Sequence, residues 1–424
     1  MPPLARTAWL EIDLDAIAAN LGAIRRAVER MSGPSVRVEP VVKADAYGHG
    51  LVPVALALER DGADGLGVAT LDEALELRAA RVSLPLLVLY PVPRELATIA
   101  AEQSITVTVG DADAAAELLE ALRRRPADRP LRVQLEVETG LGRGGVAAAD
   151  AAALATLLGA APEVELVGIW SHLQAPADAA LTGRQVDRFE AATSNAATPR
   201  HLSASGGLLA GAPVYEAVRP GLAIYGIDPD DLLDPEGRQT VGLDLELRPA
   251  MSLRARPVRV AELPAGWGVS YGPSWRTERP SRIATLPLGY GDGWPREASN
   301  RADALVRGRR VPLVGTVAMD AVMADVTDIP GPPVTTDDVF TLLGADERSP
   351  AAPIGVHELA RARNTIAWEV TTSMSARLGR VYYRAAVPVG LRTLSALALA
   401  GPRETWPGSS SGTATSASWR STRS

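Results

Sequence analysis

Lys43 is the only lysine of the chain, because the other 42 of its 43 Lys and Arg residues are arginine. Arginine stays protonated, whereas an ammonium group can lose its proton and become a nucleophile. A single primary amine in an otherwise arginine-only composition suggests a lysine that forms a Schiff base. The count alone leaves open the alternative that Lys43 is a chance survivor of an arginine-biased composition.

The surroundings of Lys43 favour the chemical interpretation. Residues 35–42 are rich in valine and predict a strand, in which Pro40 should confine regular pairing to the end of the segment. Small residues and glycines follow, as in a tight turn. Lys43 therefore falls where a strand ends and a loop begins, which is where barrel folds place catalytic groups.

Three other residues are candidates, each with a plainer alternative. Arg219 stands at a predicted strand end before a glycine turn, which favours function over one more arginine among 42. His172 also ends a predicted strand, where a lone histidine is more often structural. Tyr271 lies beside a glycine, and most such tyrosines are turn or core residues.

A repeating pattern of strands and helices must position these residues. Short apolar runs alternate with longer segments rich in Ala, Leu, Arg and Glu from about residue 10 to 225, which indicates repeated βα units. Eight such strands with intervening helices favour an α/β fold with a (β/α)8 barrel of the TIM type over an open sheet. The predicted strands are 36–42, 65–69, 86–89, 105–109, 131–137, 166–170, 201–203 and 215–218, and the predicted helices are 14–28, 51–60, 71–80, 112–124, 147–158 and 183–192.

The pattern changes near residue 230, where acidic residues, prolines and a glycine at 228–237 indicate a linker. We expect a barrel domain at 10–235 and a smaller, mainly-β C-terminal domain at 236–385, with residues 1–9 as a segment that could pair with it. Its predicted strands are 253–263, 282–288, 311–317 and 321–326. The Gly-, Ser-, Thr- and Ala-rich end, 402–424, is expected to be disordered.

Composition limits the class of protein. The 424 residues suffice for two domains, and a net charge of -7 with dispersed arginines gives no reason to expect binding to nucleic acid. The absence of cysteine excludes disulfides, thiolate zinc sites and a cysteine nucleophile, and we assign no metal. No apolar stretch reaches the roughly 20 residues that span a bilayer. The start lacks the apolar core of a signal peptide, so we expect a cytoplasmic protein without membrane association.

Seven segments extend across both predicted domains. They are VKADAYGHG at 42–50, ETGLGR at 138–143, VRPGLAIYG at 218–226, PAMS at 249–252, VSYG at 269–272, LGYGDG at 288–293 and GTVAMD at 315–320. In this order they resemble the alanine racemase family of pyridoxal-phosphate enzymes, which has a barrel followed by a β domain. The resemblance covers residues 9 to about 383.

The resemblance implies a pyridoxal 5'-phosphate cofactor and racemisation of an amino acid, with alanine as the first expectation. Lys43 matches the residue that binds the cofactor covalently and acts as one base. Tyr271 matches the second base, which this family supplies from the partner subunit of a head-to-tail homodimer. His172 is its expected neighbour, because a phenol with an ordinary pKa of about 10 needs a nearby donor or cation to act as a base.

Other matches concern binding. Arg219 resembles the residue that faces the pyridine nitrogen of the cofactor, where a permanent cation discourages protonation of the ring and suppresses side reactions such as transamination. Arg143 resembles a residue near the phenolic oxygen of the cofactor and the substrate carboxylate. Tyr47, Ser205, Gly221 and Leu222 match phosphate-binding positions, the Met319 backbone matches a carboxylate contact, Tyr290 matches a residue of the entryway, and Asp320 matches one that supports it.

The chain also departs from the family. Glu136 occupies the position of a lysine that is carbamylated in many members, and a glutamate could supply the same negative charge and orient Arg143 on a shorter stem. Trp368 replaces a tyrosine that reaches the phosphate region, so a hydroxyl is lost and bulk is gained. Ala204 and Ala318 replace the usual asparagine and cysteine. These differences leave the preferred amino acid open.

Two other functions are alternatives to racemisation. A decarboxylase of the same fold would lack the Tyr271 base and normally uses a cysteine, and this chain has none. A non-catalytic pyridoxal-phosphate-binding protein would be a single barrel and would need no second base. The length of 424 residues and the Tyr271 segment argue against it.

Overall fold

The computed structural model describes residues 4–233, 242–243, 245–346, 349–394 and 396–399. They form two compact units, one made of Ala16–Tyr47 with Val54–Arg248, and the other made of the described residues of Met1–Asp15, Gly48–Pro53 and Pro249–Ser424. The change of unit at 248–249 lies after the expected boundary at 235–236. The last part of the expected linker, 234–237, and the expected disordered end, 402–424, lie outside the described residues.

The first unit is a parallel barrel. Within its described residues eight strands follow the order β2-β10-β9-β8-β6-β5-β4-β3, and all of these pairs are parallel. A parallel bridge between Val41 and Gly67 joins the two ends of this order, which confirms the expected barrel. The strands are β2 (Arg37–Val38), β3 (Leu66–Val68), β4 (Leu86–Val88), β5 (Ile105–Val109), β6 (Leu131–Glu138), β8 (Val164–Trp170), β9 (Arg200–Ala204) and β10 (Ala217–Arg219), with β7 (Val146–Ala147) beside β6.

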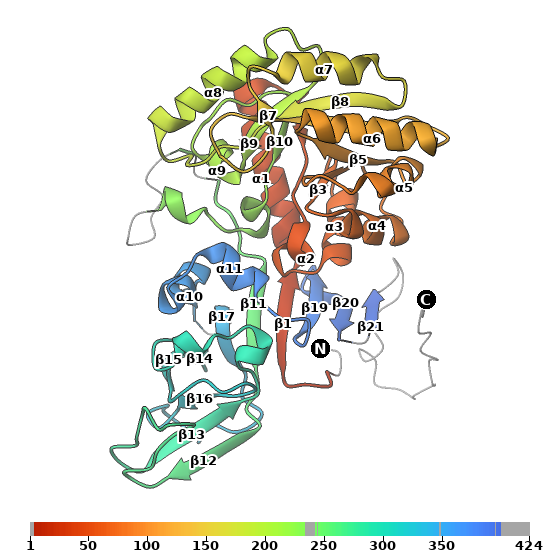
Figure 1. Ribbon diagram of the computed structural model, residues 1–424. Helices are drawn as coiled ribbons and strands as arrows, with labels where there is room; N and C mark the ends of the chain where they lie inside the picture. The colour runs from red at the N-terminus through yellow and green to blue at the C-terminus, as the bar shows by residue number, and fades with distance from the viewer. Residues whose placement is uncertain (1–3, 234–241, 244, 347–348, 395, 400–424) are drawn as a thin grey trace. The chain divides into compact units, whose positions relative to one another are not determined.

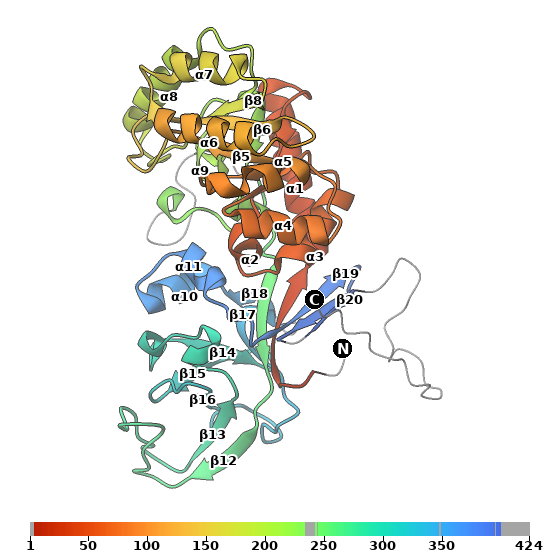
Figure 2. The same cartoon turned by 45° about the vertical axis from the view of Figure 1, so that its right-hand side comes forward.

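Helices surround these strands on the outside (Figures 1 and 2). Their apolar faces are buried, as Leu118, Leu119 and Leu122 are in α6. The sequence pattern predicted most of them, but the short helices α5 and α9 were missed, because one turn or two carries little periodicity. The helices are α1 (Leu14–Ser32), α3 (Leu51–Arg60), α4 (Leu71–Ala79), α5 (Ala97–Glu102), α6 (Ala112–Arg124), α7 (Ala151–Ala160), α8 (Ala179–Thr193) and α9 (Ser205–Leu209).

Pro40 has the effect expected of it. Regular pairing of β2 covers two residues, because a proline has no N–H to donate to a neighbouring strand. The carbonyl of Pro40 still accepts from Gly67 N (2.9 Å), and Val42 N donates to Gly67 O (2.8 Å). These bonds continue the barrel wall to the residue before Lys43.

The second unit is built on a mixed sheet. Its described strands follow the order β12-β13-β16-β15-β14-β17-β11-β1-β19-β20-β21, with β18 beside β17. β1 pairs antiparallel with β11 and parallel with β19, so the start of the chain lies inside this sheet. The strands are β1 (Ala8–Asp13), β11 (Met251–Ala255), β12 (Arg259–Leu263), β13 (Ser281–Leu286), β14 (Asp303–Val306), β15 (Arg309–Val314), β16 (Val322–Asp325), β17 (Phe340–Asp346), β18 (Ser349–Ile354), β19 (Gly379–Arg384), β20 (Val387–Thr393) and β21 (Ala396–Leu399).

One expectation for this unit was wrong. The strand predicted at 253–263 is two strands, β11 and β12, with a break around Pro257, because this residue cannot donate to a ladder. The mainly-β unit also contains two helices that were not predicted, α10 (Val356–Arg363) and α11 (Ala367–Thr372). Among the described residues, no helix is long and apolar enough to cross a membrane.

Candidate active site

A left-handed turn follows the first barrel strand. α2 (Lys43–Tyr47) has φ angles of 53°, 57° and 53° at its three central residues, none of which is glycine. Such angles cost roughly 1–2 kcal/mol per residue. The turn is held by Ala46 N, which donates to Val42 O (2.8 Å), and by Ala44 N, which donates to Glu73 Oε1 (2.7 Å). Nothing in the sequence pattern indicated this role for Glu73, which comes from α4.

The amine of Lys43 lies in a cationic environment. Burial lowers its pKa most, Arg143 and Arg219 lower it further, and Glu73 opposes them. A lower pKa raises the fraction of neutral amine, which is the form that attacks a carbonyl carbon. The environment of Lys43 is therefore suited to a nucleophile.

Arg219, the last residue of β10, is buried with its charge. Its Nη2 donates to Ser171 O (2.8 Å), its Nη1 donates to His201 O (3.2 Å) and to His201 Nδ1, and its guanidinium lies 4.8 Å from the ring centre of Trp170. Burial lowers the pKa of Arg219 to about 10, against the effect of Glu39 and Glu136. The group therefore remains a cation near neutral pH.

His201 supports this arginine and was not predicted as a site residue. Arginine can only donate, so His201 Nδ1 must accept, and the ring proton sits on Nε2, which lies 2.7 Å from Gln134 Oε1. Burial and Arg219 hold the pKa of His201 well below its usual range, in agreement with a neutral ring. The hydrogen bonds between Gln134 and His201 and between His201 and Arg219 are buried, and they thus fix the position of the guanidinium.

The predicted phosphate-binding residues come together at the ends of β9 and β10. Ser205 Oγ accepts from Gly221 N (2.9 Å) and Ala223 N (3.1 Å). A Cβ on Gly221 would lie 2.4 Å from Tyr47 Oη, so only glycine leaves room for this hydroxyl. Burial raises the pKa of Tyr47 to about 12, so its phenol stays a donor. Leu222, which begins the turn η2 (Leu222–Tyr225), adds another backbone amide to this cradle of hydroxyls and N–H groups.

Two carboxylates of β6 interact with Arg143, one with its backbone N–H and the other with its guanidinium. Glu138 accepts the backbone N–H groups of residues 140–143, at 2.7 Å for Leu141, 2.8 Å for Gly142 and 3.3 Å for Arg143. Glu136 Oε1 lies 3.9 Å from Arg143 Nη2. Burial raises the pKa of Glu136, whereas Arg143 and Arg219 lower it. The expected proximity of Glu136 and Arg143 is present, and the role of Glu138 was not foreseen.

His172 follows β8 and is a neutral histidine. Burial, followed by the charges of Arg219, Arg143 and Lys43, lowers its pKa to about 3. An imidazole in this environment can accept or donate a hydrogen bond but carries no charge at neutral pH. It therefore adds no further positive charge to the three cations.

The remaining predicted residues belong to the second unit. Tyr271, between Ser270 (φ 65°) and Gly272 (φ 54°), has 75% of its surface exposed, and Met319 and Tyr290 are 53% and 45% exposed. Ser270 Oγ donates to Thr316 O (2.6 Å) and so anchors the Tyr271 turn. Trp368 is a partly buried residue of α11.

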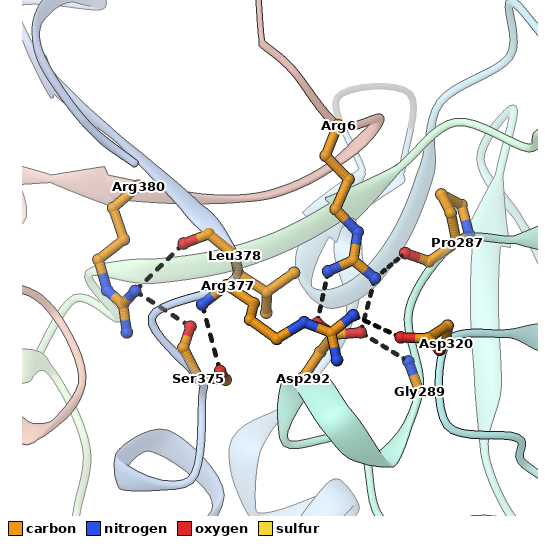
Figure 3. Close-up of polar contacts among 9 residues, drawn as sticks. All are labelled: Arg6, Pro287, Gly289, Asp292, Asp320, Ser375, Arg377, Leu378 and Arg380. Atoms are coloured by element: carbon orange, nitrogen blue, oxygen red, sulfur yellow. Dashed lines mark hydrogen bonds and ion pairs between the residues drawn. The ribbon is translucent and has the colours of Figure 1, made fainter. Parts of the chain in front are cut away.

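A buried carboxylate organises the loops that carry these residues (Figure 3). Asp292 is fully buried and accepts from Arg6 through both oxygens (2.5 and 2.7 Å), while Arg377 Nε lies 3.4 Å from Oδ1. Its Oδ2 also accepts from Gly289 N (3.0 Å), and Arg6 donates to Pro287 O (2.5 Å). One carboxylate therefore joins the start of the chain to the loop of Tyr290.

The same cluster reaches the loop of Met319. Arg377 donates to Asp320, and the amides of Tyr290 and Gly291 donate to Ala318 O (3.1 Å) and Met319 O (2.9 Å). A Cβ on Gly289 would lie 2.0 Å from the carbonyl oxygen of Ala318, so this contact requires glycine. Asp320 was expected to support Tyr290, and in the structure it shares Arg377 with Asp292.

The barrel residues suggest what they could bind. A lysine amine with a lowered pKa suits an aldehyde carbon, the cradle at Ser205 and Gly221 suits a phosphate, and Arg219 suits a ring nitrogen that accepts a hydrogen bond. Pyridoxal phosphate carries all three groups in one molecule. Fold and site thus define a pyridoxal-phosphate enzyme of the barrel class.

The N-terminal domain of alanine racemase matches residues 12–229 and its C-terminal domain matches residues 250–382. The chain therefore belongs to the alanine racemase family, whose members are isomerases that use this cofactor.

Individual relatives agree with this assignment. The alanine racemase of Symbiobacterium thermophilum is 38% identical over 89% of this chain and 97% of its own length, and that of Sorangium cellulosum is 39% identical over 88% and 98%. Among solved structures, alanine racemase from the D-cycloserine-producing Streptomyces lavendulae has a TM-score of 0.79 at 36% identity, covering 90% of this chain and 98% of its own. Alanine racemase from Bartonella henselae with covalently bound pyridoxal phosphate has a TM-score of 0.77 at 27% identity, covering 90% and 100%.

Asp292→Asn should destabilise the β unit, because at this buried position an amide N–H₂ would face Arg6 and Arg377 in place of a carboxylate oxygen. We expect a loss of about 3 kcal/mol in the free energy of unfolding, measured by guanidinium denaturation of the full chain. Asp328→Asn is the matched control, since Asp328 forms a two-oxygen pair with Arg279 on the exposed surface. Equal effects of the two substitutions would contradict the structural role of Asp292.

The neutral state of His172 predicts a pH-dependent stability. Between about pH 6.5 and pH 5 the unfolded chain takes up a proton at this residue that the folded barrel does not, because its folded pKa is depressed. Stability from this source is present above that window and is lost as the pH falls through it, by about 2 kcal/mol at pH 5. His172→Gln should flatten the pH dependence of the thermal midpoint, and parallel curves for variant and wild type would contradict the assignment.

Proposed function

We propose that the protein interconverts L- and D-alanine, with pyridoxal phosphate bound covalently to Lys43. The observation that carries the proposal is the environment of Lys43, an amine whose pKa is lowered by burial and by Arg143 and Arg219. The relatives described above are alanine racemases, which supports alanine as the substrate. When bound, the cofactor supplies an electron sink that acidifies the α-hydrogen of an attached amino acid.

The chain's own residues would bind the substrate and move the proton. Arg143 would bind the carboxylate, and its pairing with Glu136 restricts the direction of the guanidinium. Lys43 would transfer the α-proton on one face. Tyr271 would do so on the other, with His172 as its neighbour. Arg219, which remains a cation and gives up its protons reluctantly, would keep the ring nitrogen unprotonated and so restrict the enzyme to proton transfer at the α-carbon.

We also infer a head-to-tail homodimer, in which Tyr271 comes from the partner subunit. The high exposure of Tyr271 and Met319 in the single chain supports this arrangement, because large apolar side chains that are exposed together often mark an interface. The phosphate would be bound by Tyr47, Ser205 and the amides at Gly221 and Leu222. The cytoplasmic location stays a prediction.

Substitution of the two bases should give different results. Lys43→Arg should lower racemisation at least about 1000-fold, because both attachment and one proton transfer are lost. Since Lys43 is the only lysine, borohydride reduction of the wild type should fix the cofactor to the Lys43 peptide, and the variant should show no such adduct.

Tyr271→Phe should abolish interconversion but leave α-hydrogen exchange with deuterated solvent for one enantiomer, because one base remains. Proton NMR and chiral chromatography of L-alanine, D-alanine and a panel of other amino acids measure both. Retention of racemisation within about tenfold would contradict the two-base mechanism.

The same measurements on the wild type test the alternative functions. Release of carbon dioxide would indicate the decarboxylase, and a cofactor adduct without α-hydrogen exchange would indicate a binding protein. Faster turnover of another amino acid would show that alanine is not the preferred substrate.

Glu136 is proposed to fix the charge and direction of Arg143. Glu136→Gln keeps the size of the side chain and removes the charge, so the KM for alanine should rise by roughly tenfold with a smaller change in kcat. Glu165→Gln is a suitable control, because Glu165 pairs with Arg132 at the surface (3.6 Å). Unchanged kinetics and unchanged cofactor affinity in Glu136→Gln would show the proposal to be wrong.

A further inference from the structure

Gln185 is a fully buried polar residue of α8 whose amide reaches the ends of two barrel strands. Its Oε1 accepts from Gln174 N (2.9 Å), and its Nε2 donates to His172 O (3.1 Å) and to Thr139 Oγ1 (3.3 Å). His172 and Gln174 belong to the segment after β8, and Thr139 begins the turn after β6. One side chain therefore bonds to both segments.

Thr139 extends these bonds to Arg219. Its Oγ1 lies 2.8 Å from Ser171 Oγ, and the carbonyl of Ser171 accepts from Arg219 Nη2 (2.8 Å). Both hydroxyls are buried. The hydrogen bonds from Gln185 thus continue, without a solvent-exposed step, to the guanidinium at the end of β10.

The Arg143 turn is also packed against α8. Arg188, three residues after Gln185, donates from Nη1 to Thr139 O (2.8 Å). A Cβ at Gly140 (φ 137°) would lie 3.0 Å from Arg188 Nη1 and 3.4 Å from Gln185 Cγ. Gly140 is the first of the four residues whose amides bond to Glu138. The turn is therefore anchored internally by Glu138 and externally by Gln185 and Arg188 of α8.

We propose that Gln185 is a positioning residue, which sets the Arg143 turn and the His172 segment relative to each other. An amide is well suited to this place, because it presents a donor and an acceptor on one rigid plane, and the two segments offer acceptors and an N–H. A buried backbone group left without its partner would be costly, so the segments remain where Gln185 can bond to both. The kinetic consequence rests on the proposed function, but the positional one does not.

Gln185→Met tests the proposal, because methionine fills a similar volume without hydrogen-bonding groups of comparable strength. Hydrogen–deuterium exchange of the purified protein, read by mass spectrometry, should show amides 140–143 and Gln174 exchanging about tenfold faster, the factor expected when a buried hydrogen bond is lost. Thr193→Val is the matched control: Thr193 is a buried residue of α8 whose hydroxyl donates to Phe189 O (2.7 Å). It should leave these amides unchanged.

With alanine as the substrate, kcat/KM of Gln185→Met should fall roughly 10- to 100-fold, as expected when reacting groups are misplaced by a fraction of an ångström to one ångström. Most of the change should appear in KM, because Arg143 is the group displaced. Thr193→Val should keep both constants. Equal effects in the two variants would mean that Gln185 contributes only general stability, and would overturn the proposal.

Gln185→Glu gives a second readout that does not depend on filling a volume. When protonated, its carboxyl group can still donate to His172 O, and when ionised it cannot, so activity relative to the wild type should recover as the pH falls. Unchanged exchange in both segments, or a pH profile parallel to the wild type, would overturn the proposal. Faster exchange in both segments, in a chain that racemises no alanine, would support Gln185 as a positioning residue and reject the proposed function.

Discussion

The site depends on keeping the cationic side chains of Arg143 and Arg219 near the amine of Lys43. Burial lowers the pKa of Lys43 most, repulsion from Arg143 and Arg219 lowers it further, and Arg143 also lowers the pKa of Arg219. This repulsion has a chemical use, because the group with the weakest hold on its proton yields first. Lys43 has the lowest ordinary pKa of the three, so burial and the two permanent cations raise the neutral fraction of its amine. Burial and the same charges keep His172 neutral.

The surrounding residues stabilise the charges of Arg143 and Arg219 in two different ways. Glu136 lies near the guanidinium of Arg143, while Arg219 is bonded to carbonyl oxygens and a neutral histidine, which leaves its charge largely uncompensated by direct contact. Other carboxylates bond to the backbone and not to the cations. Glu73 and Glu138 each accept N–H groups of the turns that carry Lys43 and Arg143. The positions of the two turns are thus set by other groups than those that stabilise the charges of Arg143 and Arg219.

The sequence predicted the barrel and identified candidate site residues, because strand ends and motifs are local features. It predicted the effect of Pro40, since a missing N–H acts at its own position. It did not indicate Glu73, Glu138, Gln185 or His201, whose partners become neighbours only when the barrel closes. Short helices such as α9 were missed for the same reason, since they form where tertiary contacts hold them and not where periodicity is strong. Prediction failed for residues whose hydrogen bonds support the candidate site residues from other elements of the fold.

The turn at Lys43 shows why this support is needed. Consecutive left-handed residues other than glycine are unfavourable alone, and persist only where neighbouring groups determine the conformation. Glu73 and the carbonyl of Val42 do so here. A chain with one lysine cannot replace it from elsewhere in its own sequence, so the position of this amine must be secured by the fold. The strain of the turn is consistent with such a requirement, because a relaxed right-handed turn would direct the residues after Lys43, including Tyr47 of the phosphate cradle, along a different path.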